Sequence, residues 1–319
     1  MFSFKKGLAI ARVEGGELDG KVLKITEDAE QPDRERPPAR SDGLAMLDLL
    51  DESDLAQPGS RKHLKARDRL ALALALSRGD LPQDPALLAV YENGRRKIGD
   101  RLKYEINLSS GCFQMLPPNP TDGGIQTERM LIAGKSGVGK SWVACFYMLE
   151  YLRIHPTNKI VLFSRHEEEK TYQHIPHLAV KLDEEFTKEP TDITIIKNCL
   201  VVFDDCDALP DKRIMLAVKR LNDDLINNGR KYGISVLTLS HHLLNYSATR
   251  NLLNEANRVV FFNSGSSYHI KRYLKVYAGL DEPQIKKVLA IKSRWTCISL
   301  GIPGYILHET GAFILRHEA

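Results

Sequence analysis

The sequence lacks long apolar runs and paired cysteines. Among its 319 residues, no apolar stretch reaches the roughly 20 residues that a membrane-spanning helix needs, so we expect no membrane span. Its five cysteines include no C-x-x-C pair, and Cys145 and Cys199 lie in apolar segments. We therefore expect reduced thiols, with neither a disulfide framework nor a cysteine-based metal site.

A strong excess of one charge sign is also missing, because the formal net charge is only +4. The basic residues that are in excess lie after residue 128. A cluster of them falls within 271–294: Lys271, Arg272, Lys275, Lys286, Lys287, Lys292 and Arg294. Such a cluster would attract a phosphate backbone, and an ordinary solvated helical face has the same composition.

Residues 1–100 carry no catalytic motif, and their function cannot be assigned from the sequence. The segment 27–43 is rich in proline and charge and predicts a linker or a disordered stretch. The other expected elements are strands at 7–13 and 21–25, a short amphipathic segment at 44–55, and helices at 61–77 and 85–91. We predict one region over 1–100 and a second, catalytic domain over 101–319.

Residues 131–141 read LIAGKSGVGKS and contain the spacing G-x-x-x-x-G-K-S. This spacing is typical of a phosphate-binding loop, whose glycines let backbone N–H groups surround the phosphates of ATP. Lys140 would reach the β- and γ-phosphates, and the Ser141 hydroxyl would bind Mg²⁺. An apolar strand precedes the loop and a helix follows it, as this motif requires. The expected nucleotide-binding residues are Gly134, Lys135, Ser136, Gly137, Val138, Gly139, Lys140 and Ser141.

Residues 199–205 read CLVVFDD, an apolar strand that ends in two carboxylates. This is the Walker B pattern when a phosphate-binding loop is also present. Asp204 is expected to hold Mg²⁺, and Asp205 to polarise the attacking water. A strand that ends in a solvated acidic turn would give the same letters.

Apolar strands alternate with helices through the second part of the chain. Strands are expected at 106–116, 130–133, 159–165, 199–205, 234–240, 258–263, 294–300 and 305–315, and helices at 142–152, 212–228, 267–277 and 283–291. This alternation predicts an α/β fold of the P-loop NTPase class, RecA/ASCE-like, with a mainly parallel sheet covered by helices on both faces. Gly139, Asp205, Ser240 and Asn263 all follow strands, so we expect them at one edge of the sheet.

The stretch 229–295 contains GRKYGISVLTLSHH, TRNLLNEANRVVFF, SGSSYHIKRYLKVYAGLD and IKSRW. These segments resemble the genome-packaging ATPases of nucleocytoplasmic large DNA viruses, the poxvirus-type members of the FtsK–HerA superfamily. The resemblance runs from about residue 104 to 300 and does not cover residues 1–100. It implies a homo-oligomeric ring that moves double-stranded DNA, with capsid or portal components as partners. It also implies a location in the host cytoplasm, the viral factory or the virion.

The resemblance also implies roles for single residues. His241 stands where cellular relatives usually have a Gln that senses the γ-phosphate. Asp205 replaces the Glu that is common in those relatives, and its shorter side chain must lie closer to the water that it polarises. Arg230 resembles the arginine finger that one subunit supplies to the next, and Arg250 is the alternative. Either arginine could instead be an ordinary surface charge.

From these observations we predict an ATP-driven double-stranded DNA translocase that packages a viral genome. Asp205, Lys140, His241 and Arg230 are its expected catalytic residues, with ATP and Mg²⁺ as ligands. Two alternatives are a FtsK- or HerA-type DNA motor of a cell or mobile element, and a P-loop kinase of a small molecule. A non-hydrolysing scaffold is disfavoured by the intact motifs.

Overall fold

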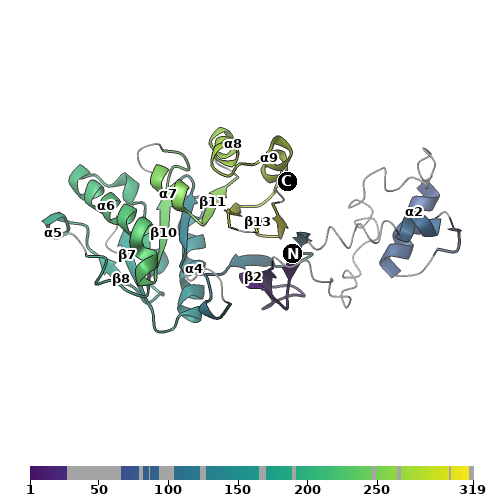
Figure 1. Cartoon of the computed structure of the whole chain (residues 1–319), viewed down its shortest axis with the longest axis horizontal. Coiled ribbons are helices and arrows are strands. Elements are labelled where there is room, and N and C mark those ends of the chain that lie inside the picture. Colours follow the sequence, from purple (N-terminus) through teal and green to yellow (C-terminus); the bar gives the residue numbers. More distant parts are fainter. Residues whose placement is uncertain are drawn as a thin grey trace. The chain divides into compact units, whose positions relative to one another are not determined.

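A computed structural model describes residues 1–26, 66–78, 82–85, 87–92, 104–122, 127–164, 170–188, 192–245, 249–263, 267–301 and 303–315 (Figure 1). By its internal contacts the chain divides into two compact units. One combines Met1–Phe2 with Glu27–Ser109, and the other combines Ser3–Thr26 with Ser110–Ala319. The linker predicted at 27–43 and the amphipathic segment predicted at 44–55 lie outside the described residues. The domain boundary placed at residue 100 from the sequence stays a prediction.

Two helical segments make up most of the described part of the first unit. Helix α2 (Ala66–Arg78) forms the later part of the helix predicted at 61–77, and residues 87–92 are helical as predicted. Apolar side chains of both segments are buried: Leu72, Ala73, Ala75, Val90 and Tyr91. The unit also contains the short strand β4 (Glu105–Asn107), and β1 (Phe2–Ser3) stands at the beginning of the chain.

A small antiparallel sheet belongs to the second unit. Its strands follow the order β3 (Val22–Ile25), β2 (Leu8–Glu14) and β5 (Cys112–Met115). β2 and β3 form the hairpin that the sequence predicts. The single strand predicted at 106–116 is wrong, because the chain forms β4 and β5 with a turn between them. Gly111 stands in that turn with φ 81°, and a Cβ there would lie 2.3 Å from the Gly15 carbonyl oxygen.

The large sheet of the second unit carries the predicted site. Its strands follow the order β14 (Gly311–Ile314), β13 (Tyr305–His308), β12 (Trp295–Ser299), β11 (Arg258–Phe262), β6 (Arg129–Ala133), β10 (Ile234–Ser240), β9 (Cys199–Asp204), β7 (Lys159–Ser164) and β8 (Leu178–Val180). Strands β11 to β8 pair in parallel, while β12, β13 and β14 are antiparallel. The predicted α/β fold with a mainly parallel sheet is therefore confirmed.

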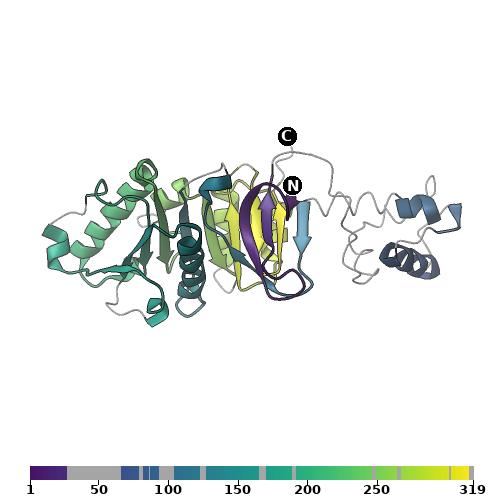
Figure 2. The ribbon, with the colours of Figure 1, turned by 90° about the horizontal axis from the view of Figure 1, so that it is seen from below.

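Helices cover both faces of this sheet (Figures 1 and 2). The helices are α4 (Lys140–Ile154), α5 (Glu184–Lys188), α6 (Lys212–Asn228), α7 (Arg250–Glu255), α8 (Ser267–Val276) and α9 (Glu282–Leu289). Short 3-10 turns are η1 (Pro120–Asp122), η2 (Lys170–Tyr172), η3 (Cys206–Ala208) and η4 (Gly229–Tyr232). Within the described ranges, no helix has the length and apolar character needed to cross a membrane.

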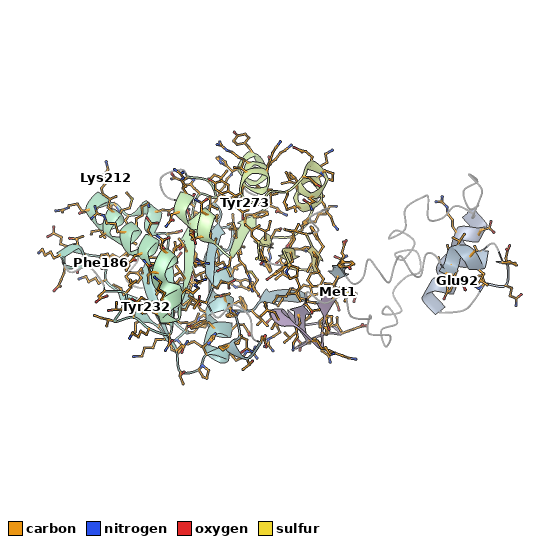
Figure 3. All side chains as sticks on the ribbon, viewed as in Figure 1. Met1, Glu92, Phe186, Lys212, Tyr232 and Tyr273 are labelled. Atoms are coloured by element: carbon orange, nitrogen blue, oxygen red, sulfur yellow. The ribbon has the colours of Figure 1, made fainter. Side chains whose placement is uncertain are left out.

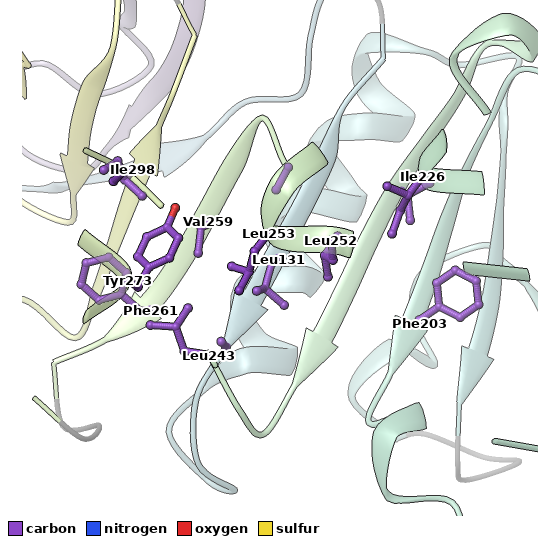
Figure 4. Packing of buried hydrophobic residues seen from close by; sticks show 14 of the residues in the cluster. Leu131, Phe203, Ile226, Leu243, Leu252, Leu253, Val259, Phe261, Tyr273 and Ile298 are labelled. Atoms are coloured by element: carbon purple, nitrogen blue, oxygen red, sulfur yellow. The ribbon is translucent and has the colours of Figure 1, made fainter. Parts of the chain in front are cut away.

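Side chains alternate between the two faces of each strand, and this alternation decides which helix each residue meets. Leu131 of β6 belongs to one buried cluster with residues of α6, α7, α8 and α9. Figure 4 shows Leu252 and Leu253 of α7 beside Leu131 and the neighbouring strands. Met130, one residue earlier in β6, faces the other side, where α4 packs.

A buried ion pair connects the amino ends of β6 and β11 to the middle of α4. Arg258 Nε lies 2.9 Å from Glu128 Oε1, and Tyr147 of α4 donates a hydrogen bond to the same carboxylate. Arg258 also donates to the Leu116 carbonyl oxygen at 2.8 Å. Burial raises the pKa of Glu128, and the Arg258 charge opposes that rise. The network holds α4, the helix that follows the predicted phosphate loop, in a fixed register with the sheet.

Candidate functional site

The segment between β6 and α4 turns through glycines with a left-handed backbone. Gly137 and Gly139 adopt the left-handed region with φ 76° and 106°, which side chains disfavour. A Cβ on Gly134 would lie 2.8 Å from both the Phe262 ring and a Val138 methyl group. The predicted order of strand, loop and helix is therefore confirmed.

The loop is tied to the neighbouring strand at its start, where Gly134 N–H donates to the Ser240 carbonyl oxygen at 3.0 Å. Its tip, Lys135 to Gly137, is exposed, while Ser141 in the first turn of α4 is half-buried. Exposed N–H groups at the tip and the positive end of the α4 dipole would both favour an anion.

The Lys140 side chain is buried, with only 5% of its surface exposed. Its Nζ donates to the Gly134 carbonyl oxygen at 3.1 Å and lies 3.4 Å from Asp205 Oδ1. Nζ also lies 3.4 Å from His241 Nδ1. A buried ammonium needs such partners, and here it joins the loop to the ends of β9 and β10.

His241 completes a closed triangle with Lys140 and Asp205. Its Nε2 lies 3.2 Å from Asp205 Oδ2. An ammonium has donors and no acceptor, so Nδ1 of His241 must accept from Lys140. In the neutral imidazole the proton then lies on Nε2, where it can be donated to Asp205. Asp205 itself has φ 50° and ψ 29°, an uncommon backbone conformation that points its carboxylate at both partners.

Asp204, the last residue of β9, is buried and lies beside Asp205 in the chain. Tyr172 OH donates a hydrogen bond to its Oδ2 at 3.0 Å. The structure thus places the two carboxylates of the Walker B segment differently. Asp205 contacts the loop lysine, while Asp204 lies against η2.

Asp207 is a site residue that the sequence reasoning missed. Its Oδ2 accepts from Ser240 Oγ at 2.7 Å and from the His241 backbone N–H at 3.1 Å. It therefore fixes the segment that carries His241. Its signal was visible as a further carboxylate in the run DDCD. In the described part of the chain, Asp205, Asp207 and His241 bring ligand atoms within 4.8 Å of one another, close enough for a metal ion.

Asn263 also lies at this edge of the sheet, as predicted, directly after β11. Its Nδ2 donates to the Ile291 carbonyl oxygen at 2.5 Å. The side chain therefore connects β11 to the segment that leads into β12, and its amide group is used for structure.

Comparison with known proteins found one curated relative with clear sequence identity. The chain is 36% identical to "Uncharacterized protein V3" of Sputnik virophage over 216 residues, which cover 67% of this chain and 85% of V3. The chain belongs to the V3 family. The resemblance to a viral family is therefore confirmed. No family model matches the sequence.

Solved structures with a similar arrangement have low sequence identity. The DNA-packaging ATPase B204 of Sulfolobus turreted icosahedral virus is 12% identical, with a TM-score of 0.42 over 60% of this chain and 98% of B204. The cytoplasmic domain of the type VII secretion ATPase EccC of Thermomonospora curvata is 14% identical, with a TM-score of 0.45 over 69% of this chain and 30% of EccC.

The two candidate arginine fingers of this V3-family chain lie in different places. Arg230 is exposed in η4, before the amino end of β10, whereas the site lies at the carboxyl end of that strand. A strand of this length spans roughly 20 Å, so Arg230 is remote from the phosphate loop of its own chain. Figure 3 marks this region with Tyr232, at the far end of α6 from Lys212. Arg250 is exposed at the start of α7, which follows the segment leaving the site edge of β10.

The basic cluster at 271–294 lies on the exposed faces of α8, α9 and the segment after α9. Two of its lysines share one partner, because Lys271 and Lys275 contact Glu282 at 3.1 and 3.6 Å. Among the described residues, Arg272 forms no such ion pair. Glu282 balances only one of the two lysine charges, so the positive charge of α8 lies both at this lysine pair and at Arg272.

Proposed function

We propose that this protein is an ATPase that drives double-stranded DNA into a viral capsid. The observation that carries the proposal is the cluster of Lys140, Asp205 and His241 beside a glycine loop that begins a helix. Membership of a virophage protein family supports the viral setting. The other FtsK- or HerA-type roles would use the same site in a cell or a mobile element.

The loop from Gly134 to Ser141 would hold the triphosphate of ATP. Its exposed N–H groups and the N-terminus of α4 would contact the phosphates, and Lys140 would reach the β- and γ-phosphates. The left-handed glycines are the feature of this chain that makes such a close approach of the backbone possible.

The residues at the site also fit a magnesium ion. Mg²⁺ prefers oxygen ligands, which Ser141 in the first turn of α4 and Asp204 at the end of β9 would supply, directly or through water. The ion would neutralise negative charge on the β- and γ-phosphates. The carboxylates of Asp205 and Asp207 add negative charge at the same edge of the sheet.

Asp205 is the proposed group that polarises the attacking water. In the arrangement described here its carboxylate is held by Lys140 and His241. Binding of a triphosphate would draw the Lys140 ammonium toward the phosphates, because their charge is larger than that of one carboxylate. Asp205 would then keep His241 as its partner and have an oxygen available for water. His241 would contact the γ-phosphate, and its position would then depend on whether that phosphate is present. Asp207 holds the segment of Ser240 and His241 that would transmit this change.

DNA movement and ring assembly are the further parts of the proposal. Arg230 or Arg250 of one subunit would complete the site of the next, since a donor supplied from outside the pocket can accelerate phosphoryl transfer by orders of magnitude. The exposed basic face of α8 and α9 would contact DNA phosphates without sequence preference. Capsid or portal proteins would dock the ring, in the host cytoplasm or viral factory.

The test is an ATPase assay with and without duplex DNA, followed by DNA protection in purified capsids. We expect turnover that duplex DNA stimulates, and nuclease-resistant DNA only when ATP and the intact protein are present. A turnover that depends on a small-molecule acceptor and ignores DNA would instead identify a P-loop kinase. Electron microscopy with a slowly hydrolysed ATP analogue would show the ring and its stoichiometry.

A further inference from the structure

The proposed site predicts how a bound triphosphate would be oriented relative to the strands of the large sheet. Lys140 Nζ points toward Asp205 and His241, which follow β9 and β10. In the sheet order these strands lie on one side of β6, and β11 and β12 lie on its other side. Lys140 marks the γ-phosphate end, so the nucleoside end of a bound triphosphate would extend toward β11 and β12.

An exposed aromatic ring stands on that second side. Trp142 follows Ser141 in the first turn of α4, and 45% of its surface is exposed. Large aromatic side chains are usually buried, so an exposed tryptophan next to a ligand loop calls for an explanation. Its ring centroid lies 4.2 Å from that of Phe146, which meets it at an interplanar angle of 64°.

A fixed cation covers the Trp142 ring. Arg294, directly before β12, has its Cζ 5.3 Å from the ring centroid. Its Nε lies 2.6 Å from Glu309 Oε1, and its backbone N–H donates to Glu309 Oε2 at 2.8 Å. One carboxylate, that of Glu309, therefore holds both the guanidinium and the backbone of Arg294. Arginine planes and tryptophan rings are both surfaces on which nucleobases stack.

We propose that Trp142 and Arg294 form the surface that binds the nucleobase of the triphosphate. This inference rests on the proposed function, because it requires the phosphates to lie in the loop from Gly134 to Ser141. Every base has a π-face, so stacking here would accept adenine and guanine with similar affinity. Selectivity for ATP over GTP would then be weak.

The first experiment compares MgATP with magnesium tripolyphosphate, which has the same phosphate chain and no base. We expect Trp142→Ala to weaken MgATP binding by about tenfold or more, since loss of base–aromatic stacking has that size, and to leave tripolyphosphate binding unchanged. Trp142→Phe keeps a stacking ring and should stay within about threefold of the wild type for both ligands. Leu149→Ala is the matched control, being 39% exposed on the same helix and two turns further on.

The second experiment uses fluorescence of the intact protein, which holds only two tryptophans. Trp295 is 4% exposed in β12 and serves as an internal constant. MgATP should change the emission that Trp142→Phe removes, and tripolyphosphate should not. This readout does not depend on the folding of Trp142→Ala.

The base-binding assignment would be overturned if Trp142→Ala lost affinity for MgATP and tripolyphosphate equally, or lost affinity for neither. Identical fluorescence responses to the two ligands would also overturn it. An unchanged affinity for both that is accompanied by failure to form a ring would place Trp142 at a subunit contact. Failure of the proposed function looks different: Lys140→Ala would then bind tripolyphosphate as well as the wild type does.

Discussion

Lys140 Nζ and Asp205 Oδ1 lie 3.4 Å apart, and this contact joins the glycine loop before α4 to the end of β9. The two groups have opposite tasks in the proposed reaction, because one binds phosphate and the other must be available for water. His241 contacts both of them. The occupancy of the loop and the availability of the carboxylate are therefore linked through one short contact.

Substitution of Lys140 and substitution of Asp205 should affect different steps, the first ATP binding and the second ATP hydrolysis. Lys140→Ala should lose MgATP binding, because the buried phosphate-directed charge is gone. Asp205→Asn should still bind MgATP and hydrolyse it at least about a hundredfold more slowly, since the group that polarises water is lost. Equilibrium binding and steady-state ATPase assays measure the two effects. Asp224→Asn, an exposed position on α6, is the control, and wild-type turnover by Asp205→Asn would reject its role as base.

Asp207 should affect the reaction by holding Ser240 and His241 in place. Asp207→Asn would weaken its hold on Ser240 Oγ and the His241 N–H, and we expect a fall in kcat of about tenfold with a small change in KM. A nucleotide-free melting temperature close to the wild-type value would show that the fold is intact. A rise in KM alone would instead mean that Asp207 contributes to ground-state binding.

The sequence predicted those parts of the site that depend on neighbouring residues in the chain. The loop, Lys140 and the carboxylates at the end of β9 follow from short motifs whose backbone conformation is set by neighbouring residues. Asp207 and the pairing of Trp142 with Arg294 were not predicted, because they arise only when distant segments meet at the sheet edge. The strand predicted at 106–116 failed because its apolar pattern was read across Gly111, where the backbone turns.

The buried thiols should make the protein resistant to alkylation. Burial raises the pKa of Cys199 and Cys297 to about 12, so almost no thiolate is present at pH 8. Mass spectrometry after iodoacetamide should find these cysteines unmodified in the native protein and modified in denaturant. Cys112, which is half-exposed, should react first. Rapid modification of Cys199 in the native protein would contradict the buried strand.

The same thiols should make the stability of the folded state decrease as the pH rises. Their pKa in the folded protein lies above the ordinary value of 9.0, so the folded state keeps protons that the unfolded chain releases. Their contribution to stability is complete below about pH 9 and is lost as the pH rises toward 12. The denaturant concentration at which half of the protein is unfolded should therefore decrease as the pH is raised from 8 to 10.5. A midpoint that rises over this range would reject the prediction.

DNA binding should depend more on Arg272 than on the lysines beside it. Lys271 and Lys275 already share Glu282, so Arg272→Ala should reduce the slope of log affinity against log salt by about one unit, for duplexes of any sequence. Lys188→Ala, at the exposed end of α5, is the matched control. A slope that stays the same in Arg272→Ala would move the DNA path away from α8.

Mixing of variants tests which arginine would complete a neighbouring site in the proposed ring. Arg230 is separated from its own loop by the length of β10, so we expect Arg230→Ala to keep ATP affinity and assembly and to lose DNA-stimulated hydrolysis. Lys140→Ala subunits lack the loop lysine and keep the finger. Adjacent subunits of the two kinds would rebuild one site from an intact loop and an intact finger, and partial activity should return. If mixing restores nothing, and Arg250→Ala with Lys140→Ala recovers activity instead, the finger is Arg250 at the start of α7. Arg230 would then be a surface charge at the opposite edge of the sheet.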